Sequence, residues 1–198
     1  DSYLSVVESL NHASIALGKN LKIKWVDADT VTDETAPEIF KGVGGIIVPG
    51  GFGNRGIEGM INSAKYARTH NLPYFGICLG MQIAVIEYAR NVLGYKDANS
   101  REFDEEGNRL VIDLMPDQYG LIKGGTMRLG AYPCEVKEGT TLYKAYGKKS
   151  ISERHRHRYE FNNEYRKELT DAGLTIGGTS PDDKIVETVE ITERPFYV

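Results

Sequence analysis

The chain has 198 residues, which is enough for a single domain with a full hydrophobic core. Hydrophobic residues make up 40% and charged residues 26%, and the net charge of −4 gives no reason to expect nucleic acid or an anionic membrane as a partner. Nothing resembles a signal peptide or a membrane span, and the two cysteines fit free thiols in a cytoplasmic protein better than a disulfide scaffold. Four histidines and two cysteines show no zinc-type spacing, so no metal site is expected.

The first half of the chain predicts helices and strands in alternation. In chain order we expect a helix over residues 1–17, a strand over 21–25, a helical turn over 37–40, a buried strand over 44–48, a helix over 57–67, a strand over 73–77 and a helix over 81–92. The strand over 21–25 is indicated by the alternation of Leu21, Ile23 and Trp25 with lysines. This order is typical of a mostly parallel sheet with helices on both faces, in which ligands bind beyond the carboxyl ends of the strands.

A glycine-rich loop, Pro49–Gly53, follows the buried strand over 44–48. It lacks the spaced glycines of a dinucleotide fingerprint and the Gly-Lys-Ser/Thr of a P-loop, so a phosphate site is the weaker interpretation. We expect instead that its backbone approaches a small ligand closely, with amide groups pointing at that ligand.

The stretch from Gly76 to Gln82 carries the main candidate for chemistry. An apolar run leads into Cys78, and the helical pattern begins directly after it. Gly76 and Gly80 flank the cysteine, which allows strand and helix to pack closely around a nucleophile elbow. The positive end of the helix would favour the thiolate, and the backbone N–H of Leu79 would be free to donate to an oxyanion. A buried structural cysteine is the alternative, and the flanking glycines favour the nucleophile.

Short β segments dominate the second half of the chain. We expect strands over residues 110–114, from 124 onward with Cys134–Val136 in one of them, over 153–161 and over 196–198, a helix over 163–169, and an antiparallel pair of 174–176 with 185–191. The run over 153–161 is rich in arginine but too short and isolated for a nucleic-acid patch. It could present an arginine that clamps a carboxylate, or it could be a solvated strand face. Cys134 follows a proline without flanking glycines, so we interpret it as structural.

Three later motifs join the loop and the elbow to give a family likeness. They are Asn99–Phe103, Gly124–Gly130 and Arg154–Tyr159. Together, these motifs make the whole chain resemble the class I (triad-type) glutamine amidotransferases, and within that group the C-terminal glutaminase domain of the CTP synthase family. The resemblance implies an α/β fold with an open, mostly parallel central sheet, flavodoxin-like with helices on both faces, plus a small antiparallel β addition.

The resemblance also implies a reaction and its residues. Cys78 would attack the side-chain amide of L-glutamine and form a glutamyl thioester that water hydrolyses. The backbone N–H groups of Gly51 and Leu79 would form the oxyanion hole. The substrate-binding positions would be Gly51, Phe52, Leu79, Gln82, Glu102 and Arg158. Glu102 can neutralise the α-ammonium of glutamine, and Arg158 can pair with its α-carboxylate. Phe52 and Arg55 match positions through which the family's activator GTP is sensed.

In the family, such a domain supplies ammonia to an N-terminal synthetase domain that converts UTP to CTP. The resemblance therefore implies no cofactor in the present domain, ATP and Mg²⁺ in the synthetase domain, GTP as an allosteric activator, and a homotetrameric full-length protein.

The family's general base is a histidine, oriented by a carboxylate, in a Phe-His-Pro-Glu motif a few residues beyond the strand that Phe196–Val198 begins. We therefore expect residues 1–198 to be one amidotransferase domain truncated at both ends, without its first strand and without that motif. Such a fragment should show little or no glutaminase turnover by itself. The alternatives are another class I amidotransferase, a gamma-glutamyl hydrolase, or, for the fragment, a regulatory module that binds a ligand without chemistry.

Overall fold

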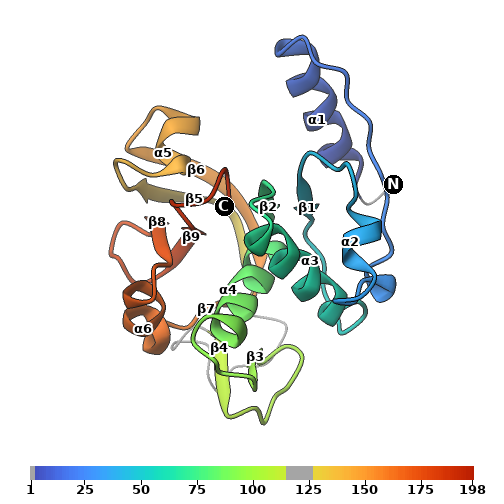
Figure 1. Ribbon diagram of the computed structural model, residues 1–198. Coiled ribbons are helices and arrows are strands. Elements are labelled where there is room, and N and C mark those ends of the chain that lie inside the picture. The colour runs from blue at the N-terminus through green and yellow to red at the C-terminus, as the bar shows by residue number, and fades with distance from the viewer. Residues whose placement is uncertain (1–2, 115–126) are drawn as a thin grey trace.

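The computed structural model describes residues 3–114 and 127–198 (Figure 1). The helices are α1 (Leu4–Ala16), η1 (Ala28–Thr30), α2 (Ala36–Ile39), α3 (Ile57–Thr69), α4 (Leu79–Asn91), α5 (Thr141–Tyr146), η4 (Asn163–Tyr165) and α6 (Arg166–Asp171). The strands are β1 (Ile46–Val48), β2 (Tyr74–Gly76), β3 (Ala98–Ser100), β4 (Arg109–Leu114), β5 (Arg128–Val136), β6 (Ser150–His157), β7 (Tyr159–Phe161), β8 (Thr175–Thr179) and β9 (Val186–Glu190). Residues 124–126, where the sequence predicts the start of a β segment, lie outside the described ranges.

β2 is the middle strand of the parallel part of the fold. It pairs in parallel with β1, with Val48 opposite Gly76. On its other side, the N–H groups of Tyr74 and Gly76 donate to the carbonyl oxygens of Phe196 and Val198, at 2.8 and 2.9 Å. The predicted strands over 44–48, 73–77 and 196–198 are thus neighbours whose carboxyl ends point to one edge.

The remaining strands form the antiparallel part and its junction with the parallel part. β3 pairs in parallel with β4, which pairs antiparallel with β7. Asn99 and Ser100, the first two residues of the motif Asn99–Phe103, belong to β3. The order β6-β5-β8-β9 gives a four-stranded antiparallel sheet, so the predicted antiparallel pair of 174–176 with 185–191 is confirmed as β8 and β9. The predicted fold class, an α/β sheet with an antiparallel addition, is confirmed.

Helix α4 joins the two parts. Figure 1 shows it at the centre, with α1, α2, α3 and β1 on one side and β3 to β9 on the other. It is buried without interruption over residues 82–89, because it packs against α3 and against strands from both parts. Within this core Glu87 is fully buried and pairs with Arg68 at 2.7 Å, and the rings of Tyr74 and Tyr197 stack at 4.7 Å. The core therefore holds the start of α4 firmly against β2.

The predicted strand over residues 21–25 is wrong. This segment belongs to no strand, and Leu21 and Trp25 are 41% and 66% exposed. The alternation of Leu21, Ile23 and Trp25 marks an apolar face, but a strand also needs a neighbour for its backbone hydrogen bonds, and among the described residues it has no such ladder. α1 lies where the sequence predicts a helix, yet it buries none of its residues. In the part of the chain that the structure describes, no helix combines the length and apolar character needed to cross a membrane.

Candidate active site

Cys78 lies where β2 ends and α4 begins. Its φ of 55° and ψ of −103° hold a non-glycine residue in a strained backbone region. A Cβ on Gly76 would lie 2.4 Å from the backbone carbon of Gly80, and a Cβ on Gly80 would lie 2.1 Å from the carbonyl oxygen of Val48. Both positions therefore require glycine, and the predicted strand, turn and helix of a nucleophile elbow are confirmed as local structure.

The glycine-rich loop lies against this elbow. A Cβ on Gly50 would be 3.6 Å from the Cβ of Cys78, and one on Gly51 would be 3.2 Å from Cδ2 of Leu79. This proximity follows from the parallel pairing of β1 with β2, since the loop and the elbow follow neighbouring strands at the same edge. The structure thus brings together the backbone of Gly51, Cys78 and Leu79.

Glu102 reaches the same loop from the turn after β3. Its Oε1 accepts a hydrogen bond from the N–H of Gly53 at 3.1 Å, and its own N–H donates to the hydroxyl of buried Ser100 at 3.2 Å. The carboxylate is close enough to Cys78 to raise the pKa of the thiol. Glu102 therefore shares the site with the loop and the cysteine.

Gln82 contacts the chain where β6 passes into β7. Gln82 is 5% exposed, and its Nε2 donates to the carbonyl oxygen of Tyr159 at 3.1 Å. Its Oε1 is buried and has no hydrogen-bond partner among the described residues. Arg158 directly precedes Tyr159, so the fold brings this arginine to the first turns of α4.

The electrostatics of Cys78 differ from the expectation. The residue is exposed, yet partial burial of its sulfur raises the pKa of the thiol. The N–H of Leu79 hydrogen-bonds to the sulfur and lowers the pKa, as the helix start predicts, but burial and the charges of Glu102 and Glu160 outweigh it. The predicted effect of the helix start is therefore present, but the net shift of the pKa is upward.

Two further predicted residues lie at the outer surface of the loop. Phe52 is 92% exposed. Arg55 is also exposed, and its guanidinium pairs with Asp29 at 3.0 Å and with Asp27 at 3.4 Å. Neither side chain is enclosed by the site.

The sequence analysis did not predict a largely buried cluster of charged and titratable side chains, formed by Arg128, His157, Glu160 and Glu187. Glu160 accepts a hydrogen bond across 2.7 Å from Nε2 of His157, with Nη1 of Arg128 at 3.4 Å. Arg128 also holds Glu187 with both terminal nitrogens, at 2.6 and 2.9 Å. The available signal was the two-residue period of β6, which puts His155 and His157 on one face and the exposed arginines on the other.

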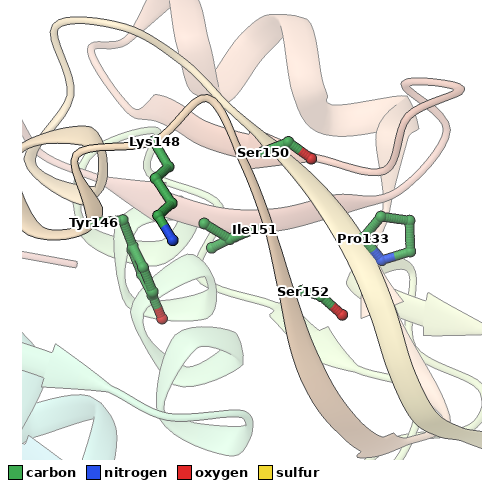
Figure 2. A pocket seen from close by; sticks show the side chains of 6 residues that line it. All are labelled: Pro133, Tyr146, Lys148, Ser150, Ile151 and Ser152. Carbon is green, nitrogen blue, oxygen red and sulfur yellow. The ribbon is translucent and has the colours of Figure 1, made fainter.

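Cys134 is 2% exposed, and burial raises its pKa to about 12, in agreement with a structural cysteine. A separate pocket of about 490 Å³ lies at β5, β6 and the end of α5, and Figure 2 shows the side chains that line it. It is lined by Pro133, Tyr146, Lys148, Ser150, Ile151 and Ser152, none of which is a predicted site residue. Within residues 3–114 and 127–198, no three His, Cys, Asp or Glu side chains are grouped so that they could hold a metal ion.

Comparisons with known proteins identify the family of the chain. The family model for class-I glutamine amidotransferases matches residues 1–198. The chain is 57% identical to the CTP synthase of Clostridium beijerinckii and 52% identical to that of Bacillus subtilis, covering 100% of this chain and 37% of each relative. It therefore spans little more than a third of the length of these curated relatives.

A solved structure extends the comparison to three dimensions. The glutaminase domain of Trypanosoma brucei CTPS, with bound acivicin, matches with a TM-score of 0.91 and 40% identity, over 100% of this chain and 78% of that one. Both the sequence and the fold are thus shared along the whole chain. The chain belongs to the class I glutamine amidotransferase family, and within it to the glutaminase domains of CTP synthases.

Proposed function

We propose that this domain hydrolyses L-glutamine through a thioester on Cys78 and passes the ammonia to a synthetase domain of a longer protein. The observation that carries the proposal is the position of Cys78, strained at the start of α4 and in contact with the Gly50–Gly51 loop. The sulfur would attack the amide carbon, and ammonia would leave from the tetrahedral intermediate. The N–H groups of Gly51 and Leu79 would donate to the oxyanion, each contributing on the order of 10²–10³ in rate.

The rest of the site would hold the amino-acid end of glutamine. Glu102 would neutralise the α-ammonium, and its hydrogen bond from the N–H of Gly53 would weaken as the carboxylate turns to the substrate. Arg158 would pair with the α-carboxylate, and the buried Oε1 of Gln82 offers an acceptor for a substrate N–H. Phe52 would contribute only if substrate packs against its exposed ring.

The α-ammonium would also act on the nucleophile. Burial and two carboxylates, Glu102 and Glu160, raise the pKa of the Cys78 thiol. A bound cation next to Glu102 would cancel part of that negative potential, so the thiolate would become easier to form when substrate is present.

The general base would come from residues that follow Val198 in a longer protein. Val198 accepts a hydrogen bond from the N–H of Gly76, so a strand continuing in this register would run alongside Cys78. We therefore propose that residues 1–198 alone turn glutamine over slowly or not at all. In support, the histidines of this chain have other surroundings. His12 lies on α1, His70 stacks on Tyr66, and His155 and His157 face Glu187 and Glu160.

The remaining parts of the proposal concern the whole protein. The whole protein would be a ligase that uses ATP and Mg²⁺ to aminate UTP to CTP. It would be activated by GTP bound near Phe52 and Arg55, and it would assemble as a homotetramer. The support for these parts is the identity to CTP synthases, 37% of whose length this chain spans. The two free thiols support a cytoplasmic location.

Labelling with a diazo-ketone analogue of L-glutamine tests the proposal on the full-length protein. Cys78 should be alkylated rapidly and protected by L-glutamine, while Cys134 stays unmodified, as mass spectrometry of peptides would show. Cys78→Ser should abolish ammonia release from glutamine. Labelling at both cysteines without protection would contradict the proposal. Protectable labelling without ammonia release would indicate the regulatory module instead.

A further inference from the structure

The chain bends where it leaves one sheet for the other. β6 belongs to the four-stranded antiparallel sheet and ends at His157, whereas β7 belongs to the sheet with β3 and β4 and begins at Tyr159. Arg158 is the single residue between them. Its position relative to Cys78 therefore depends on the geometry of this bend.

A side-chain hydrogen bond closes the bend. Nε2 of His157, on one side of Arg158, lies 2.7 Å from Oε1 of Glu160 on the other side. Both side chains are largely buried, with exposures of 16% and 7%. A hydrogen bond between a buried imidazole and a buried carboxylate is of the strong, charge-assisted kind when the ring is protonated.

The acceptor of this bond is itself fixed. Arg128 is 5% exposed, approaches Glu160 at 3.4 Å and holds Glu187 of β9 at 2.6 Å, so it connects the two sheets at the bend. Glu160 is therefore not free to follow His157 if that side chain moves.

A third contact ties the bend to the helix that carries the nucleophile. The carbonyl oxygen of Tyr159 accepts from Nε2 of Gln82, which lies in the first turns of α4, at 3.1 Å. Arg158 thus lies between His157, which is held by Glu160, and Tyr159, which is held by Gln82.

We propose that His157 is a positioning residue, whose hydrogen bond to Glu160 sets the bend so that Arg158 meets the α-carboxylate of glutamine. This inference rests on the proposed function, which gives Arg158 that role. The inference assigns this role to His157 and not to His155, the other histidine of β6, because His155 faces Glu187 at 3.7 Å and does not span the bend.

The test uses two probes on the full-length protein. One is the diazo-ketone analogue of L-glutamine, and the other is the same compound with hydrogen in place of the α-carboxylate. With each probe the sulfur of Cys78 bonds to the carbon that carried the diazo group, N₂ leaves, and the thiol proton ends on that carbon. The readout is the ratio of the two second-order labelling rates, from which general effects on the thiol or on folding cancel.

His157→Phe keeps an aromatic ring but cannot hydrogen-bond to Glu160. Its labelling ratio should fall about tenfold, since only the probe with a carboxylate loses a charge-assisted partner. His157→Gln, whose Nε2 can reach the same acceptor, should recover most of the ratio. The matched control is His155→Phe, on the same face of β6, whose ratio should stay within about twofold of the wild-type value. His157→Asn, which is too short to reach Glu160, is the second variant if His157→Phe does not fold.

Arg158→Gln separates this inference from the function on which it rests. If Arg158→Gln collapses the ratio but His157→Phe and His157→Asn leave it unchanged, the positioning role is refuted and the proposed function stands. Equal losses with both probes in the His157 variants would also refute it, because they indicate a merely structural role. If Arg158→Gln itself leaves the ratio unchanged, the carboxylate site assigned to Arg158 fails and the inference fails with it.

Discussion

Gly76→Ala tests the close approach of β2 and α4 behind the nucleophile. A Cβ at this position would lie 2.4 and 2.5 Å from the backbone carbon and oxygen of Gly80, and 2.7 Å from the nitrogen of Met81. Ordinary contact begins at 3.4 Å, so the start of α4 must move by about 1 Å, the difference between 3.4 and 2.4 Å. These are backbone atoms, which cannot rotate away as a side chain would.

The expected effect is larger on activity than on stability. Overpacking of this kind costs about 1–3 kcal/mol, and the lower chain entropy of the unfolded alanine variant returns about 0.4–1 kcal/mol. A net loss of about 1–2 kcal/mol should appear in the urea transition of the domain. A shift of about 1 Å in the N–H of Leu79 and in Cys78 should lower glutamine turnover on the order of 10²-fold.

Turnover is measured as ammonia released from glutamine by the full-length protein, with urea unfolding in parallel. Gly44→Ala is the control, because a Cβ on Gly44 meets nothing within 4 Å. It should leave turnover unchanged, and because its unfolded chain also has a lower entropy it should raise the free energy of unfolding by about 0.4–1 kcal/mol. The reasoning about close packing is refuted if Gly76→Ala keeps its turnover within about threefold of wild type.

Three other predictions concern buried groups. Arg68→Met should lower the free energy of unfolding in urea by about 3–5 kcal/mol, since it leaves the buried carboxylate of Glu87 without its ion-pair partner. Changing both Arg68 and Glu87 to Met should recover most of this loss, and a double variant as unstable as Arg68→Met would contradict the reasoning. The rate of Cys78 alkylation by iodoacetamide should still increase with pH above the ordinary pKa of a thiol, because burial and nearby carboxylates raise the pKa of Cys78. Glu102→Gln should shift this pH–rate profile to lower pH, and an unchanged profile would contradict the role of the Glu102 charge. Cys134, whose pKa is raised to about 12, should react only after unfolding, and native labelling as fast as that of Cys78 would exclude its burial.

The elbow could be predicted from sequence because its signals are local. A change from a strand pattern to a helical pattern and two glycines around Cys78 suffice to define a tight turn. Proximity of the Gly50–Gly51 loop followed from a general property of parallel sheets, in which the ends of neighbouring strands share an edge.

Features that depend on distant partners could not be predicted. The alternation over residues 21–25 could not say whether a neighbouring strand exists, and in the structure Leu21 and Trp25 remain exposed. Arg128 meets Glu160 and Glu187 across separations of 32 and 59 residues, and charged residues in an alternating strand ordinarily indicate a solvated face. The raised pKa of Cys78 has the same origin, because burial and the approach of Glu160 are properties of the folded chain.

The pairing of Phe196–Val198 with β2 has a practical consequence for handling the protein. Since Val198 bonds to the N–H of Gly76, any affinity tag joined to it would emerge next to the reactive thiol and could block the approach of small molecules.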